Sequence, residues 1–191
     1  MKKSILFVSI MCLITLNVFA QYNYNVSDEF PYGQPNPEAP EQINDYQAMI
    51  GSCDCKSFIR NQDGTWADPV DMTWTWKYIL NGMAVQDETL KKDGSHAGSI
   101  RQYIADSSRW YVHWYSSKTP STTFPTWEGN KKDDKIILSR DQKAPNGTEG
   151  NYRLTFYDMS KTGYKWVGEW TTKDESIIYP TWKIDCNKRK M

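Results

Sequence analysis

From Ser52 onward the chain alternates, in short runs, between aromatic or β-branched residues and polar ones, with turn residues between the runs. A period of two residues is typical of strands with one buried face. Asn81-Gly82 and Asp93-Gly94 tolerate the positive φ angles that tight hairpin turns need. The pattern predicts strands at residues 53–60, 69–80, 83–91, 97–105, 109–116, 122–128, 134–141, 151–158, 163–172 and 177–186, with a turn at Gly129-Asn130.

So many consecutive antiparallel strands do not remain a flat sheet, because a twisted sheet of this size curls and closure removes its exposed edges. We therefore expect an all-β fold, a single antiparallel up-and-down β-barrel of about 8–10 strands, with a two-sheet sandwich as the alternative. A short helix is predicted at residues 41–50, because Pro40 is acceptable at its start and Tyr46, Met49 and Ile50 share one face.

The first twenty residues have the pattern of a cleavable signal peptide. Lys2 and Lys3 precede an apolar run at residues 5–16, and Ala20 is the small residue before the predicted cleavage site. The apolar run is shorter than the roughly 20 residues of a membrane-spanning helix. A lipoprotein signal at Cys12 is disfavoured, because this cysteine lies inside the apolar run. The expected organisation is a signal peptide (1–20), an extended linker (21–40) and a barrel domain (41–188).

The charge balance limits the partners that the exported chain can have. The full sequence has 23 basic and 23 acidic residues, and removal of Lys2 and Lys3 leaves 21 against 23, a formal charge of −2. There is no basic excess to hold nucleic acid. No second apolar run predicts an integral membrane segment. We expect a periplasmic or extracellular protein whose oligomeric state the sequence leaves open.

Three cysteines remain after the predicted cleavage, Cys53, Cys55 and Cys186. An exported chain can form disulfides, and an odd number leaves one thiol over. The first and last strands of an up-and-down barrel are neighbours, so Cys186 is expected to pair with Cys53 or Cys55. That bond would close a loop of about 130 residues and stabilise the fold by about 4 kcal/mol. No metal site is expected, because structural zinc needs four ligands.

Alternation assigns the large aromatic side chains to one face of each strand. Trp74, Trp76 and Tyr78 share a face, and Trp166 and Trp170 do so in a later strand. We expect these faces to point into the barrel, because burial of such rings is the largest hydrophobic gain that the chain offers.

The order of several motifs resembles the calycin-like small barrels of uncharacterised function, relatives of the lipocalin, fatty-acid-binding and nitrobindin barrels. These motifs are the stretch at residues 74–84, the stretch at residues 166–171 and the final Trp182-Lys183-Ile184. The resemblance implies eight to ten strands around a pocket for a small apolar or amphipathic ligand. Nitrobindin-like barrels bind haem through a histidine, but His96 falls in a turn and His113 lies opposite the Trp face. We therefore expect no cofactor, with haem at His113 as the alternative.

Three charged residues, Arg101, Arg153 and Glu169, lie mid-strand beside aromatic residues. Facing the lumen, an Arg–Glu pair would hold the head group of an acidic or sugar-like ligand, because a guanidinium binds a carboxylate with two hydrogen bonds. Alternation instead places Glu169 opposite Trp166 and Trp170, which favours an exposed pair on the outer wall, worth under about 1 kcal/mol.

Three functions are compatible with these features. The leading hypothesis is an exported barrel that binds a small hydrophobic or amphipathic ligand in its lumen, with the candidate residues Trp76, Trp114, Trp166, Trp182, Arg101, Arg153 and Glu169. The second is a carbohydrate-binding or surface-interaction module that uses exposed aromatic residues. The third, less favoured, is a small barrel hydrolase or isomerase with Glu169 or His113 as its base.

Overall fold

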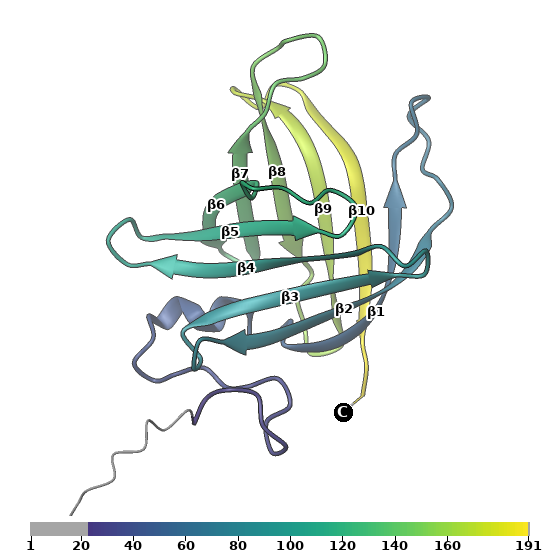
Figure 1. The fold of residues 1–191 in the computed structure, drawn as a ribbon. Helices are drawn as coiled ribbons and strands as arrows, with labels where there is room; N and C mark the ends of the chain where they lie inside the picture. Colours follow the sequence, from purple (N-terminus) through teal and green to yellow (C-terminus); the bar gives the residue numbers. More distant parts are fainter. Residues whose placement is uncertain (1–22, 191) are drawn as a thin grey trace, which may run out of the picture.

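The structure is a computed structural model that describes residues 23–190, so the predicted signal peptide and Cys12 lie outside the described residues. Ten strands follow one short 3-10 helix (Figure 1). The elements are η1 (Glu41–Tyr46), β1 (Gly51–Ile59), β2 (Val70–Ile79), β3 (Ala84–Lys91), β4 (His96–Ile104), β5 (Arg109–Ser116), β6 (Thr126–Lys132), β7 (Lys135–Asp141), β8 (Gly150–Tyr157), β9 (Gly163–Thr172) and β10 (Ile178–Lys188). None of the helices in this part of the chain is long and apolar enough to span a membrane.

The strands form a closed barrel in which each strand pairs antiparallel with its neighbours in sequence and β10 pairs with β1. The predicted fold class, an all-β up-and-down barrel, is confirmed. The β2–β3 connection is made by the predicted turn, where Asn81 and Gly82 have φ angles of 52° and 80°. A side chain at position 82 would also collide with the N-terminal segment, because its Cβ would lie 2.4 Å from the Gln34 carbonyl oxygen.

A disulfide crosses the seam between the first and last strands. Cys55 and Cys186 are direct cross-strand partners and are covalently bonded over a sequence separation of 131 residues. This result settles the two alternatives left by the sequence, since Cys53 is a buried free thiol. Burial raises the pKa of the Cys53 thiol, and a hydrogen bond with Tyr164 opposes that rise.

Two predicted elements differ from those observed. β6 covers residues 126–132 rather than 122–128, and it runs through Gly129-Asn130, which was predicted as a turn. Gly129 is needed inside the strand for close approach, because a Cβ there would lie 2.0 Å from the Ile137 carbonyl oxygen. The turn falls at Asp133, which has a φ of 55°. The predicted helix is a shorter 3-10 helix that ends at Tyr46.

The N-terminal segment closes one end of the barrel. Residues 23–40, predicted as an extended linker, have no regular element but are hydrogen-bonded to the barrel. The Tyr78 amide donates to the Tyr32 carbonyl at 2.9 Å, and the Asn36 amide donates to the Gly82 carbonyl at 3.1 Å. Tyr46, from η1, is fully buried. We call this the closed end; it also carries the β2–β3, β4–β5, β6–β7 and β8–β9 turns (Figure 1).

The other end, called the open end below, carries the connections β1–β2, β3–β4, β5–β6, β7–β8 and β9–β10. In the closed half the barrel is filled by aromatic side chains, whose inward direction the alternation predicted. Tyr46, Trp76, Trp110 and Phe156 have no exposed surface, and Tyr46 stands edge-on to Trp110 with ring centroids 4.8 Å apart. The closed half of the lumen is therefore a packed core.

Candidate functional site

A cavity of about 300 Å³ occupies the open half of the lumen. Strands β4, β5, β6, β7, β8, β9 and β10 contribute to its wall, mainly through alternate, inward-facing residues. The wall consists of Ser99, Val112, Trp114, Trp127, Arg140, Gln142, Tyr152, Leu154, Trp166 and Trp182. This composition, mostly apolar with a few polar groups, is typical of small-molecule sites.

Four tryptophans form most of the aromatic wall, and neighbouring groups fix some of them in place. The Trp182 indole donates to the Ser57 hydroxyl at 2.8 Å, and the Trp127 indole donates to the Tyr152 carbonyl at 3.2 Å. Trp166 packs edge-on against Trp182 with ring centroids 5.1 Å apart. The wall is therefore largely built before any ligand enters.

Arg140 is the charged residue in this wall. Its guanidinium lies 4.3 Å from the centroid of the Trp127 ring, and its Nη2 donates to Gln142 Oε1 at 2.7 Å. Its Nε is buried and has no hydrogen-bond partner. Burial lowers the pKa of Arg140 and the nearby Tyr152 opposes that effect, but an arginine side chain stays protonated in proteins. The cavity wall thus contains a cation.

A second cation, Lys91, lies close to one of the wall residues. Its Nζ is 4.8 Å from the centroid of the Trp182 ring, an arrangement in which the aromatic face attracts the ammonium. Burial lowers the pKa of Lys91, while Asp93 acts in the opposite direction. The open half therefore has positive charge at Arg140 and close to Trp182.

The candidate Arg101 lies in the closed half, outside the cavity wall. It is 2% exposed and forms an ion pair with Asp87, and its guanidinium lies 4.4 Å from the Trp76 ring centroid. Asp87 also accepts a hydrogen bond of 2.7 Å from the Trp74 indole. Trp76 has no exposed surface and donates to the Tyr164 hydroxyl at 2.8 Å. Both predicted ligand contacts are core residues instead, because Tyr46 and its neighbours fill this half.

Arg153 and Glu169 also lie outside the cavity wall. They are direct cross-strand partners on the outer face, with Arg153 Nε 2.9 Å from Glu169 Oε1. Arg153 also pairs with Glu175 at 2.7 Å. The outward position agrees with the alternation, but the pair is not exposed as predicted, since Glu169 is only 8% exposed. A ligand in the lumen cannot touch either residue.

His113 lies on the outer face of β5, where its Nδ1 is 3.0 Å from the Thr126 hydroxyl. A haem held in the lumen therefore cannot be ligated by His113. Among residues 23–190, no three His, Cys, Asp or Glu side chains are grouped so that they could hold a metal ion. Glu169 and His113, the two bases considered for an enzyme, both lie outside the cavity wall.

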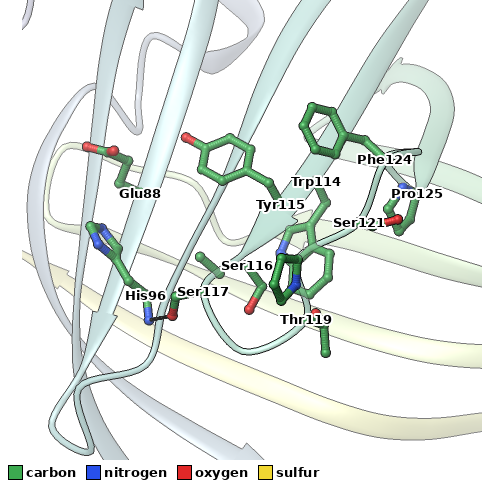
Figure 2. A pocket seen from close by; sticks show the side chains of 12 residues that line it. Glu88, His96, Trp114, Tyr115, Ser116, Ser117, Thr119, Ser121, Phe124 and Pro125 are labelled. Atoms are coloured by element: carbon green, nitrogen blue, oxygen red, sulfur yellow. Dashed lines mark hydrogen bonds between the residues drawn. The ribbon is translucent and has the colours of Figure 1, made fainter.

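A second hollow, of about 610 Å³, lies at the rim of the open end beside residues 117–125. Figure 2 shows Glu88 and His96 on one side of it and Tyr115 and Phe124 above Trp114. The rings of Tyr115 and Phe124 have centroids 6.2 Å apart, and Phe124 is 52% exposed. Trp114 contributes to both hollows, so one indole lies between them.

Of the seven predicted contact residues, the cavity unites three, Trp114, Trp166 and Trp182. The prediction missed Trp127 and Arg140 in the wall. The sequence did contain a signal for Arg140, which follows Ile136 and Leu138 at intervals of two residues, so all three share the inward face. Trp127 was harder to assign, because the ends of β6 were predicted four residues too early.

The fold and the cavity define a small, closed antiparallel β-barrel with a ligand-sized hollow in the open half of its lumen. No family model and no curated protein matches the sequence. In three dimensions the chain is similar to the crystal structure of Rv2717c from M. tuberculosis, with a TM-score of 0.53 and 8% sequence identity. The match covers 80% of this chain and 100% of that one. At this identity the likeness shows the barrel fold alone.

Proposed function

We propose that the chain is an exported, calycin-like barrel that binds a small hydrophobic or amphipathic molecule in the open half of its lumen. The observation that carries this proposal is the cavity of about 300 Å³ walled by four tryptophans and containing the charged side chain of Arg140. Cavities of this size and composition are typical ligand sites. The Cys55–Cys186 disulfide supports export, because such bonds form and persist in oxidising compartments.

Tryptophan fluorescence tests the binding proposal, since indole rings line the cavity. The oxidised protein would be titrated with a panel of fatty acids, retinoids, haem and small aromatic compounds. We expect saturable quenching by at least one compound, and a weaker response in Trp182→Ala, which removes a half-buried indole that lines the lumen cavity but not the rim hollow. The matched control is Trp66→Ala, which removes a half-buried indole that is absent from the cavity wall. Absence of quenching by every compound of the panel, or an equal change of the quenching in the two variants, would contradict binding in the lumen.

Cell fractionation tests export. The full-length chain, expressed with its own first twenty residues, is expected outside the cytoplasm and shortened before Gln21. Replacement of Lys2 and Lys3 by glutamate should retain the chain in the cytoplasm, because the basic start of a signal peptide is lost. Recovery of the unaltered chain in the cytoplasm at full length would contradict this part of the proposal.

The rim hollow favours a second candidate function, binding of a carbohydrate. Tyr115 and the exposed Phe124 offer aromatic faces beside Glu88, His96 and several hydroxyl groups (Figure 2). Calorimetric titration with soluble oligosaccharides tests this candidate function. It is supported if the heat of binding is lost in Phe124→Ala and kept in Trp66→Ala. Absence of heat with the unaltered protein would remove this candidate.

A further inference from the structure

The cavity wall has hydrogen-bond donors to spare and few free acceptors. The Arg140 guanidinium donates to Gln142 and has no carboxylate among the ion pairs of the described residues. The side-chain oxygen of Gln142 is engaged by Arg140, and its carbonyl accepts from the Trp170 indole at 2.8 Å. The Tyr152 hydroxyl is 2.7 Å from the Thr181 hydroxyl. A ligand that supplies oxygen acceptors would complete this wall, because a buried polar group without a partner is costly.

The charged residues around the cavity also favour a ligand with negatively charged oxygen atoms. No aspartate or glutamate belongs to the wall. The ion pairs of the described residues leave Arg140 without a carboxylate, whereas the other inward-facing arginine, Arg101, is paired with Asp87. Removal of a charge from water is costly unless the charge is paired and hydrogen-bonded. The protein thus neutralises one lumen arginine with its own chain and leaves the other for an external anion.

The remaining wall restricts the shape of that anion. The indole rings of Trp114, Trp166 and Trp182 present flat surfaces, and stacked or edge-on contacts between rings add to simple burial. The volume of about 300 Å³ is at the lower end for small-molecule sites. One ring or two fused rings suit such a space better than an extended chain.

We infer that the ligand is a small, flat aromatic acid whose carboxylate accepts hydrogen bonds from Arg140 and whose ring lies among the cavity tryptophans. This inference rests on the proposed function of the open half of the lumen. The carboxylate would accept hydrogen bonds from the terminal nitrogens of the Arg140 guanidinium, which lines the cavity without a carboxylate partner among the described residues. A guanidinium matches a carboxylate in geometry as well as charge. Lys91, beside Trp182, adds attraction for an anion.

A matched pair of probes tests the inference, naphthoate and its neutral carboxamide, naphthamide. The two share one ring system and differ in the charge of the substituent. Calorimetric titration of the oxidised barrel is expected to show naphthoate binding about tenfold more tightly or better, because hydrogen bonds to charged groups are the stronger ones. In Arg140→Gln the preference for naphthoate should vanish while naphthamide binding is kept.

The control variant is Lys143→Gln, three residues further along the chain, in the connection between β7 and β8. Lys143 pairs with the exposed Glu149 and is absent from the cavity wall, so its loss should leave the preference unchanged. Arg140→Lys keeps the charge and should retain part of the preference, which also covers the case in which Arg140→Gln fails to fold.

The outcomes separate this inference from the proposed function. Equal binding of naphthoate and naphthamide, or a preference unaffected by Arg140→Gln, would overturn the inference that the ligand is an acid held by Arg140. Either result would leave the proposal of binding in the lumen intact. The same holds if neither probe binds but an apolar compound of the panel does. Failure of both probes and of the whole panel would overturn the proposed function as well.

Discussion

The two halves of the lumen are built from the same kinds of side chain and end in opposite states. In the closed half, Tyr46, Trp76 and Phe156 leave no exposed surface, and Arg101 is paired with Asp87. In the open half, four tryptophans surround a cavity of about 300 Å³ and Arg140 has no carboxylate partner. Composition alone therefore does not decide whether an aromatic barrel is a core or a site.

Two features account for the difference. The segment before β1 inserts Tyr46 among the rings of the closed half, and the described residues supply no equivalent side chain to the open half. Each half also has one inward arginine, but only Arg101 faces an acidic neighbour on the adjacent strand. The inserted Tyr46 and the acidic partner of Arg101 therefore distinguish the packed half from the half that holds the cavity. Mutation can remove either of them.

The largest effect is expected for Trp76→Ala in the closed half. Loss of a fully buried indole should lower the free energy of unfolding by about 3–5 kcal/mol, because a large cavity remains. Chemical denaturation monitored by circular dichroism measures the change. Trp114→Ala, at the half-buried rim, should cost clearly less. Equal losses for the two variants would mean that the halves do not differ as core and site.

Asp87→Ala tests the counter-charge and should have the next largest effect. It leaves Arg101 buried without its partner, and removal of one member of a buried ion pair costs about 3–5 kcal/mol. The same denaturation measurement applies. Asp71→Ala, which breaks the exposed Lys56–Asp71 pair, is the control and should change stability little. A small loss for Asp87→Ala would show that the arginine finds water or another partner.

Removal of the disulfide tests how much the covalent bond adds to strand pairing at the β1–β10 seam. The double variant Cys55→Ala/Cys186→Ala should lose about 2–5 kcal/mol, because the unfolded chain regains freedom over a loop of 131 residues. Cys53→Ala removes a neighbouring buried sulfur and keeps the bond, so it controls for packing. If the double variant were no less stable than Cys53→Ala, the seam would owe its closure to strand pairing alone.

The smallest effect concerns acid sensitivity at the open end. Asp93, in the β3–β4 turn, accepts hydrogen bonds from the Ser95 hydroxyl and amide and from Lys118 at 2.9 Å. These contacts hold the pKa of the Asp93 carboxyl well below its ordinary value of 3.8. The stabilisation is therefore complete above about pH 5 and declines as pH falls through 3.8 and below, where the unfolded chain takes up the proton first.

Asp93→Asn should accordingly lower the unfolding temperature slightly near neutrality, where the charged form contributes in full, and should match the unaltered chain at the most acidic pH values. The acid side of a plot of unfolding temperature against pH should therefore become flatter. Asp45, at the closed end, differs from Asp93 in the direction of its pKa shift. Burial raises the pKa of the Asp45 carboxyl in spite of a hydrogen bond from Trp110. An unchanged acid slope in Asp93→Asn would show that this turn contributes nothing to the pH dependence.

Much of the fold was predictable because period-two alternation and turn residues are local signals. Nine of the ten strands start and end within two residues of the predicted bounds. The exception, β6, was misassigned because Gly129-Asn130 reads as a turn, whereas the glycine is there to let the Ile137 carbonyl approach. A glycine demanded by a partner strand cannot be told from a turn glycine in one sequence.

The site was only partly predictable, because alternation gives the direction of a side chain and not its depth. Trp76 and Trp114 both face inward, yet one is core and the other is cavity wall. The depth depends on the stagger of the strands and on the plug supplied by Tyr46, which are set by long-range contacts. The Arg101–Asp87 pair was missed for the same reason, since its members are 14 residues apart on adjacent strands.

The course of the chain has one practical consequence. The described chain starts and finishes beside the plugged base, where Tyr24 contacts Asn81 and the Arg189 amide donates to the Ser52 carbonyl (Figure 1). Immobilisation or fusion through either end of the described chain would thus place the attachment at the closed end. The open end, with the cavity, would then face the solution.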